Sequence, residues 1–223
     1  MADSSSSLVT IQDPGSPASE AYRALRMNLL FSSLDKPIRK LLFSSPSSGE
    51  GKSTTLANLA VTLAQVDQRV IMIDCDLRRP TLHTLFGLNN TKGISDMVLN
   101  DQALLEPPYQ NTEINGLRLI ASGALPPRPG DMLGSKKLEI VLDRLMQDAD
   151  ILLLDAPPVM AATDAAILAT KVDGVLLVIS AGETKREQAQ RSVERLHQVN
   201  ANILGAVLNN VPLDASFTGE YYK

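Results

Sequence analysis

The sequence predicts an α/β fold in which a mostly parallel sheet is flanked by helices on both faces. Short apolar segments alternate with segments of helical periodicity along most of the 223 residues, as they do in chains built from βαβ units. The apolar segments are nearly continuous in hydrophobic residues, which is typical of strands buried on both faces. The chain length suits one large domain rather than two small ones.

The N-terminal part begins with a segment rich in Ser, Pro and Gly, residues 1–17, that we expect to be flexible. Glu20–Ser33 then shows apolar residues on one helical face, with Ser19 as a candidate cap. The domain proper is expected to span residues 18–213. A C-terminal tail, residues 214–223, contains tyrosines and reads as unstructured.

The expected strands are short, apolar and rich in β-branched residues or leucine. They are Lys40–Ser44, Arg69–Ile73, Leu117–Ala121, Ile151–Leu154, Val175–Ile179 and Ile203–Leu208. The expected helices between them are Lys52–Gln65, Lys136–Gln147, Thr163–Thr170 and Lys185–Val199. Thr84–Gln110 and Ala121–Gly134 are richer in Gly, Pro and polar residues, so we expect long loops with short helices there.

Composition excludes several classes of protein. The net charge is −4, so nothing indicates a nucleic-acid partner. A single cysteine, Cys75, rules out a disulfide within the chain and favours a reducing compartment. The apolar segments are shorter than the ~20 residues that cross a bilayer. We therefore expect a cytoplasmic protein, with any membrane attachment through a partner or a missing segment.

The segment Ser45–Thr54 has the features of a phosphate-binding loop, or Walker A motif. It follows an expected strand and opens an expected helix. Gly49 and Gly51 would let backbone N–H groups approach phosphate oxygens, Lys52 would reach the β- and γ-phosphates, and Ser53 would bind Mg²⁺. The residues expected around the nucleotide phosphates are Ser48, Gly49, Glu50, Gly51, Lys52, Ser53 and Thr54.

One position departs from the usual G-x-x-x-x-G-K-[ST] pattern. Pro46 stands where the first glycine is normally found. The alternative interpretation is a Gly- and Ser-rich turn before an ordinary helix. The order of strand, loop, Gly-Lys-Ser-Thr and helix favours phosphate binding.

Two acidic motifs follow apolar strands. Asp74 and Asp76 stand at a strand end on one face, where two carboxylates repel each other and favour a cation between them. The alternative is a pair of solvated turn residues that cap the next helix. Asp155 follows four apolar residues and precedes Pro157 and Pro158, which end the strand. It either binds Mg²⁺ beside the phosphates or merely ends the strand.

Together these motifs resemble the bacterial tyrosine kinases of capsule and exopolysaccharide export, which have the deviant Walker-type P-loop fold of MinD/ParA-like ATPases. The resemblance extends from Ser16 to the C-terminus. Asp74-Cys-Asp76-Leu-Arg78 matches the family's motif after the second strand, and Asp155-Ala-Pro-Pro158 matches its second acidic motif. The MinD/ParA-like relatives carry a lysine early in the loop, where this chain has Ser47, as in the kinase branch.

The resemblance implies ATP and Mg²⁺ as cofactors and assigns roles to individual residues. Lys52 would bind the phosphates, and the metal would be held by Ser53, Asp76 and Asp155, largely through water. Asp74 would take the proton of the tyrosine hydroxyl, whose unperturbed pKa is about 10. The remaining implied roles are charge stabilisation by Arg78 or Arg79 and contact with adenine by Asn209.

The family also carries Glu-x-x-Arg-x-x-Arg on its first helix, matched here by Glu20, Arg23 and Arg26. The resemblance implies a subunit interface that closes a ring, in which one protomer's tail enters the next active site. The alternative is an i,i+3 salt bridge on a solvated helix face. Tyr221 and Tyr222 would be the phosphoacceptors, although the family has a larger tyrosine cluster; alternatively they are tyrosines on a frayed end.

The favoured function is therefore an autophosphorylating protein-tyrosine kinase that regulates polysaccharide synthesis and export. Its partners would be protein tyrosine substrates and a transmembrane polysaccharide co-polymerase, which activates it and is fused to the kinase in some relatives. That partner would hold it at the inner face of the plasma membrane. The alternatives are a MinD/ParA-like ATPase switch without kinase activity, which Ser47 disfavours, and a regulatory nucleotide-binding module, which three intact acidic residues disfavour.

Overall fold

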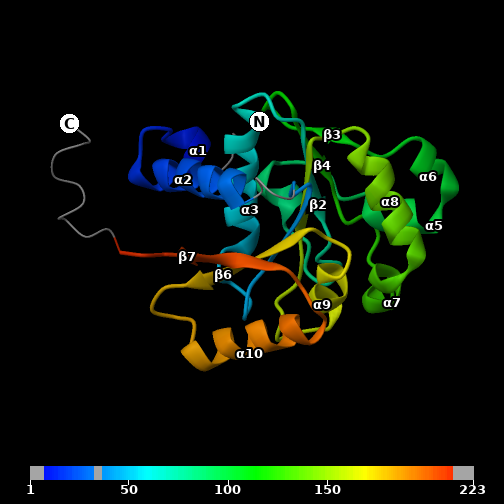
Figure 1. Cartoon of the computed structure of the whole chain (residues 1–223). Helices are drawn as coiled ribbons and strands as arrows, with labels where there is room; N and C mark the ends of the chain where they lie inside the picture. Colours follow the sequence, from blue (N-terminus) through cyan, green and yellow to red (C-terminus); the bar gives the residue numbers. More distant parts are fainter. Residues whose placement is uncertain (1–7, 33–36, 213–223) are drawn as a thin grey trace.

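The computed structural model describes residues 8–32 and 37–212, and it confirms the expected α/β fold (Figure 1). Within these residues, a seven-stranded sheet has the order β3-β4-β2-β5-β1-β6-β7. All neighbouring strands are parallel except β3, which runs antiparallel to β4 at one edge. The strands are β1 (Lys40–Ser44), β2 (Val70–Asp74), β3 (Gln110–Asn111), β4 (Leu117–Ile120), β5 (Ile151–Asp155), β6 (Gly174–Ser180) and β7 (Ile203–Asn209).

Helices cover both faces of the sheet. One face carries α1 (Val9–Gln12), α2 (Pro17–Ser32), α3 (Lys52–Ala64) and α4 (Leu82–Leu85). The other face carries α5 (Ile94–Leu99), α6 (Asp101–Leu105), α7 (Pro129–Gly134), α8 (Lys136–Met146), α9 (Asp164–Ala169) and α10 (Arg186–Gln198). In the part of the chain that the structure describes, no helix combines the length and the apolar character needed to cross a membrane.

The strands supply both hydrophobic cores at once because successive side chains point to opposite faces. On β1, Leu41 and Phe43 enter the core beneath α3, whereas Leu42 enters the core beneath α8. On β5, Leu153 joins the first core, while its neighbours join the second. This double burial explains why the strands read as continuous apolar segments in the sequence.

We expected residues 1–17 to be flexible. The structure instead packs residues 8–16 against α2 and α3. Leu8 is fully buried in the core beneath α3. The backbone N–H and the hydroxyl of Thr10 both donate to Asn58 Oδ1 on α3, at 3.1 and 2.9 Å. These contacts fix α1, a helix of only four residues.

Helix α2 also begins earlier than the sequence suggested. Pro17 occupies its first position, which suits a residue without an N–H. The Ser16 hydroxyl accepts the backbone N–H of Ser19 at 3.2 Å, so Ser16 takes the capping role expected of Ser19. Ser19 is instead buried, and its hydroxyl donates to the carbonyls of Val9 and Asp13.

The strand register brings the functional segments to one edge of the sheet. Asp155 at the end of β5 is level with Phe43 on β1 and with Asp74 at the end of β2. The loop that follows β1 therefore leaves the sheet beside both acidic residues. Ligands of open α/β sheets bind at this carboxyl edge.

Candidate active site

The phosphate loop runs between β1 and α3. Gly49 and Gly51 both have φ of +85°, a conformation that L side chains rarely adopt. A Cβ on Gly51 would lie 2.1 Å from Asn209 Nδ2, so this position also lacks room for a side chain. Asn209 Nδ2 donates to the carbonyl of Glu50 at 3.1 Å. The end of β7 thus supports the loop, next to the position predicted for the nucleotide.

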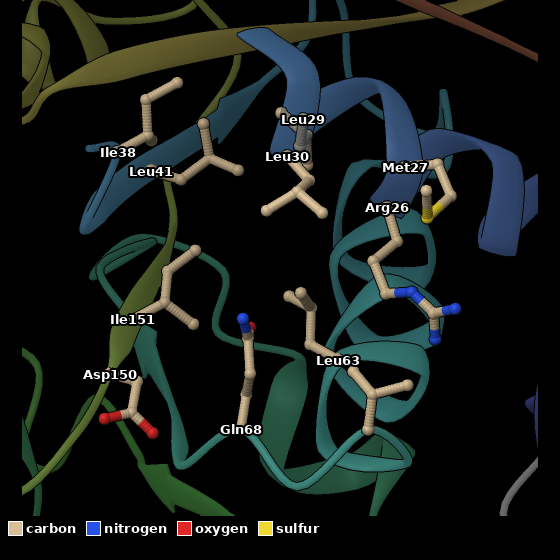
Figure 2. Close-up of a pocket in the computed structure, with 11 residues that line it drawn as sticks. Arg26, Met27, Leu29, Leu30, Ile38, Leu41, Leu63, Gln68, Asp150 and Ile151 are labelled. Atoms are coloured by element: carbon tan, nitrogen blue, oxygen red, sulfur yellow. The ribbon is translucent and has the colours of Figure 1, made fainter. Parts of the chain in front are cut away.

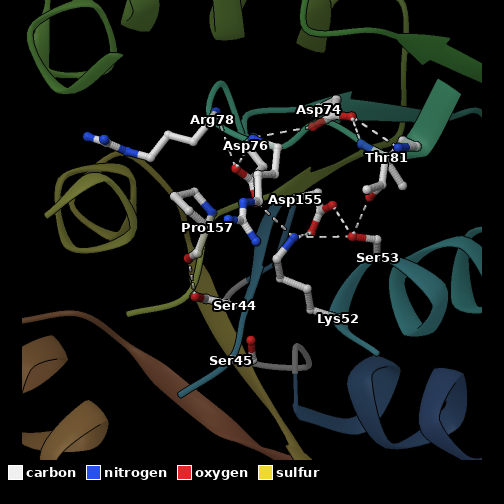
Figure 3. A network of polar contacts seen from close by, with 12 residues as sticks. Ser44, Ser45, Lys52, Ser53, Asp74, Asp76, Arg78, Thr81, Asp155 and Pro157 are labelled. Atoms are coloured by element: carbon white, nitrogen blue, oxygen red, sulfur yellow. Dashed lines mark hydrogen bonds and ion pairs between the residues drawn. The ribbon is translucent and has the colours of Figure 1, made fainter. Parts of the chain in front are cut away.

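Lys52 lies between two of the predicted metal-binding carboxylates (Figure 3). Its Nζ is 3.2 Å from Asp76 Oδ2 and 3.1 Å from Asp155 Oδ1, and the residue is only 9% exposed. The Ser53 hydroxyl donates to Asp155 Oδ2 at 2.5 Å. The structure therefore brings together four of the predicted site residues, which come from the start of α3 after the phosphate loop, the segment after β2, and the end of β5.

Asp74 is fully buried behind this group. Its Oδ2 accepts the backbone N–H groups of Thr81 and Leu82, each at 3.0 Å, and its Oδ1 accepts that of Asp76 at 3.3 Å. Burial, together with the nearby negative charge of Asp155, raises the pKa of Asp74 to about 7. A pKa near neutrality suits a general base, and Oδ1 keeps one lone pair, because among the described residues it accepts only the N–H of Asp76.

The electrostatics of the group favour a divalent cation. Burial would lower the pKa of Lys52, but the charges of Asp155 and Asp76 together outweigh it and raise that pKa. Burial also raises the pKa of Asp155, against the stabilising charge of Lys52. One ammonium group thus pairs with two carboxylates, those of Asp76 and Asp155, and a third carboxyl group, that of Asp74, is buried nearby. Hydroxyl and carboxylate oxygens are ligands that Mg²⁺ accepts, so the residues fit this ion.

The two neighbouring arginines point to different places. Arg78 extends away from Lys52 (Figure 3) and forms a bidentate ion pair with Asp164, with Nε–Oδ2 and Nη2–Oδ1 distances of 2.8 and 3.1 Å. Arg79 instead lines the pocket over the phosphate loop. Of the two candidates for stabilising charge on a phosphoryl group, the geometry favours Arg79.

The pocket over the phosphate loop has a volume of about 410 Å³. Most of its lining comes from the loop and the first turn of α3, and the remainder from the segment after β2. The lining residues are Ser48, Gly49, Gly51, Lys52, Ser53, Thr54, Asp76, Arg79, Thr81 and Leu85. A nucleotide phosphate chain with its metal requires backbone N–H donors, a cation and a carboxylate close together, and this lining supplies them with Gly49, Lys52 and Asp76.

The residues predicted to form an interface lie on α2 and have partners within the chain. Arg23 pairs with Glu20 at 2.7 Å and also donates to the carbonyl of Pro14. Arg26 donates to the carbonyl of Thr62 on α3 at 2.6 Å. The i,i+3 salt bridge is thus present, and the interface role stays a prediction.

Arg26 also borders an apolar cavity of about 290 Å³ beneath α2 and α3 (Figure 2). This cavity lies at the amino ends of β1 and β5, at the opposite edge of the sheet from Lys52. Its apolar lining is Met27, Leu29, Leu30, Ile38, Leu41, Leu63, Val66 and Ile151. It offers few polar groups and is not the nucleotide site.

Sequence reasoning missed several residues that contact the site. The Thr81 hydroxyl donates to Ser53 Oγ at 3.0 Å, and Asp164 neutralises Arg78. The Thr184 hydroxyl donates to Glu50 Oε1 at 2.7 Å and ties the loop after β6 to the phosphate loop. Their sequence surroundings carry no motif, and only their contacts reveal them. Two other predicted residues, Tyr221 and Tyr222, lie outside the described residues.

A phosphate loop that opens α3, with acidic residues at the ends of β2 and β5, defines a P-loop NTPase. The ParA family model, described as "NUBPL iron-transfer P-loop NTPase", matches residues 38–220. The chain is 38% identical to the tyrosine-protein kinase YwqD of Bacillus subtilis, over 96% of this chain and 90% of that relative. It is 32% identical to the tyrosine-protein kinase etk of Escherichia coli K12, over 96% of this chain but 29% of that longer protein.

A solved structure agrees with these relatives. The kinase domain of the Escherichia coli tyrosine kinase ETK superposes with a TM-score of 0.88 at 32% identity, covering 94% of this chain and 82% of that one. The chain therefore belongs to the bacterial tyrosine-protein kinases of capsule and exopolysaccharide systems, within the ParA-type P-loop NTPases. That superfamily binds nucleotides.

Proposed function

We propose that this chain transfers the γ-phosphoryl group of ATP to tyrosine hydroxyl groups of proteins, with Mg²⁺ bound, in capsule or exopolysaccharide synthesis and export. The observation that carries the proposal is the position of Lys52, which lies directly after the phosphate loop and between Asp76 and Asp155. Ser53 contacts Asp155 beside it. Membership of a tyrosine-kinase family supports the choice of acceptor.

Each residue of this group has a task in phosphoryl transfer. Lys52 would exchange its two carboxylate partners for the β- and γ-phosphate oxygens and neutralise charge there. Ser53, Asp76 and Asp155 would hold Mg²⁺, the carboxylates largely through water. When bound, the ion neutralises charge on the phosphate oxygens. The N–H groups around Gly49 and Gly51 would orient the phosphate chain, and Asn209 would contact the adenine.

The acceptor side of the reaction needs a base and a countercharge. Asp74 is the proposed base, and its pKa of about 7 suits the task near neutral pH. The tyrosine proton would go to Asp74 Oδ1, which accepts a single backbone N–H among the described residues, while Oδ2 keeps those of Thr81 and Leu82. Arg79, on the pocket wall, is placed to stabilise charge on the moving phosphoryl group.

We also propose that phosphorylation occurs between copies of the chain. Tyr221 and Tyr222 of one copy would be the acceptors for the site of its neighbour, with Glu20, Arg23 and Arg26 at the interface of a ring. A transmembrane polysaccharide co-polymerase, separate or fused, would activate the kinase and hold it at the inner face of the plasma membrane. The longer Escherichia coli relative shows that such kinase regions occur within larger proteins.

The test is mass-spectrometric mapping of phosphotyrosine after incubation with ATP and Mg²⁺, comparing the parent with Lys52→Met. The cytoplasmic tail of the partner would be added in a parallel reaction. We expect phosphate on Tyr221 or Tyr222 that depends on Lys52. Hydrolysis of ATP without any phosphotyrosine, even with the partner tail, would refute the kinase proposal and favour an ATPase switch.

A further inference from the structure

The Thr81 side chain contacts the predicted metal ligand Ser53 although the two residues belong to different segments. Thr81 lies just before α4 and is exposed on the pocket above the phosphate loop. Its Oγ1 is 3.0 Å from Ser53 Oγ, and Figure 3 shows the two hydroxyls facing each other. Thr81 therefore reaches the site although no phosphate-loop or acidic motif includes it.

The hydrogen bonds of Ser53 fix the direction of this contact. A serine hydroxyl has one proton to donate and two lone pairs that accept. The proton goes to Asp155 Oδ2 at 2.5 Å, so Thr81 must be the donor to Ser53. Lys52 Nζ faces the second lone pair at 3.2 Å. Once Lys52 turns to the phosphates, that lone pair alone is free to bind a cation.

The backbone of Thr81 is held independently of its side chain. Asp74 Oδ2 accepts the N–H of Thr81 and that of Leu82, each at 3.0 Å. Asp74 is fully buried at the end of β2, so its carboxylate is a fixed point. Hydrogen bonds to a charged acceptor are stronger than those between neutral groups. The Thr81 hydroxyl is thereby presented to Ser53 from a rigid base.

We propose that Thr81 is a positioning residue for Mg²⁺: it occupies one lone pair of Ser53 and leaves the other directed at the ion. Asp74 positions Thr81 in turn, whether or not it also acts as a base. This inference rests on the proposed function, because it assumes that Ser53 binds Mg²⁺ beside a nucleotide. It adds a residue from the segment after β2 to the metal site.

The experiment measures binding of a fluorescent ADP analogue to the full chain, once in EDTA and once across a titration with Mg²⁺. Thr81→Val removes the donor, and Thr81→Ser restores it. Thr84→Val is the matched control, because Thr84 is also exposed and lies on α4 but contacts His83 instead of the site. We expect Thr81→Val to raise the Mg²⁺ concentration needed for half-maximal binding about two- to tenfold, the effect of one hydrogen bond.

Thr81→Ser and Thr84→Val should both match the parent, and affinity in EDTA should be the same for all four proteins. If Thr81→Val weakens binding equally in EDTA and in Mg²⁺, its effect is on local structure and the inference is overturned. An unchanged Mg²⁺ midpoint overturns it too. A parent that binds no nucleotide would overturn both the inference and the proposed function. If the Mg²⁺ midpoint depends on Thr81 but the mass-spectrometric test finds no phosphotyrosine, only the kinase proposal is overturned.

Discussion

The ion pair between Arg78 and Asp164 gives a sharp test of how the segment after β2 is held. Asp164 is fully buried, whereas the Arg78 side chain is 47% exposed. Arg78 donates to both oxygens of Asp164, so Arg78→Ala would leave a buried carboxylate without its cation. Asp164→Asn keeps the volume of the side chain and removes the charge.

The size of the effect follows from the burial of the two partners. Breaking a fully buried pair costs about 3–5 kcal/mol because one charge is left uncompensated. Water reaches half of Arg78, and Asp164 lies in the first turn of α9, where the helix dipole favours a negative charge. We therefore expect Arg78→Ala to lower the free energy of unfolding by about 1–3 kcal/mol.

A double-mutant cycle measured by urea unfolding, followed by circular dichroism, separates the pair from its surroundings. The double variant Arg78→Ala/Asp164→Asn should recover most of the stability lost in Arg78→Ala, since it buries no unpaired charge. The matched control is Arg128→Ala, because Arg128 and its partner Asp131 are both exposed; it should change stability by less than about 0.5 kcal/mol. Additive losses in the cycle, or an Arg78→Ala loss no larger than the control, would refute the reasoning.

Three further predictions test other parts of the structure. Gly51→Ala places a Cβ 2.1 Å from Asn209 Nδ2 at a φ of +85°, so nucleotide affinity measured by fluorescence should fall about tenfold or more. Leu8→Ala should cost about 2–5 kcal/mol in urea unfolding because Leu8 is fully buried; no loss would contradict the packing of residues 8–16. Burial and a hydrogen bond to Asp148 raise the pKa of Tyr109 to about 12. Its stabilising contribution should be complete below about pH 10, its unfolded value, and lost as pH rises through about 12. Unfolding of the parent and of Tyr109→Phe at several alkaline pH values should show this difference, and parallel profiles would contradict it.

The sheet and its main helices could be predicted from the sequence because their signals are local. Val70–Asp74 and Ile151–Asp155 each carry four apolar residues before an acidic one, and in the structure each acidic residue ends its strand. The packing of residues 8–16 could not be predicted in this way. It depends on Asn58, a helix residue far along the chain that accepts both polar groups of Thr10.

The same distinction separates the parts of the site. Lys52, Ser53, Asp76 and Asp155 stand in motifs whose spacing fixes where they fall on a parallel sheet, so their proximity could be foreseen. The different directions of the Arg78 and Arg79 side chains could not be foreseen. Residues in a turn do not follow a regular period, so the sequence does not predict which of two neighbours faces a pocket. Asp164, which binds Arg78, is 86 residues further along the chain.

The three carboxylates of the site differ in whether they lose their partners when a nucleotide binds, and this difference predicts that nucleotide and metal bind together. The contacts of Asp74 are backbone N–H groups, which stay in place when a ligand enters. Asp76 and Asp155 instead share the Lys52 ammonium group. A nucleotide that draws Lys52 to its phosphates leaves these two carboxylates without that cation, in a buried site where unpaired charge is costly. Only a second cation restores the balance, so Mg²⁺ should tighten nucleotide binding, and nucleotide should tighten Mg²⁺ binding by the same factor. Equal nucleotide affinity with Mg²⁺ and with EDTA would show that Lys52 keeps its carboxylates when the phosphates arrive.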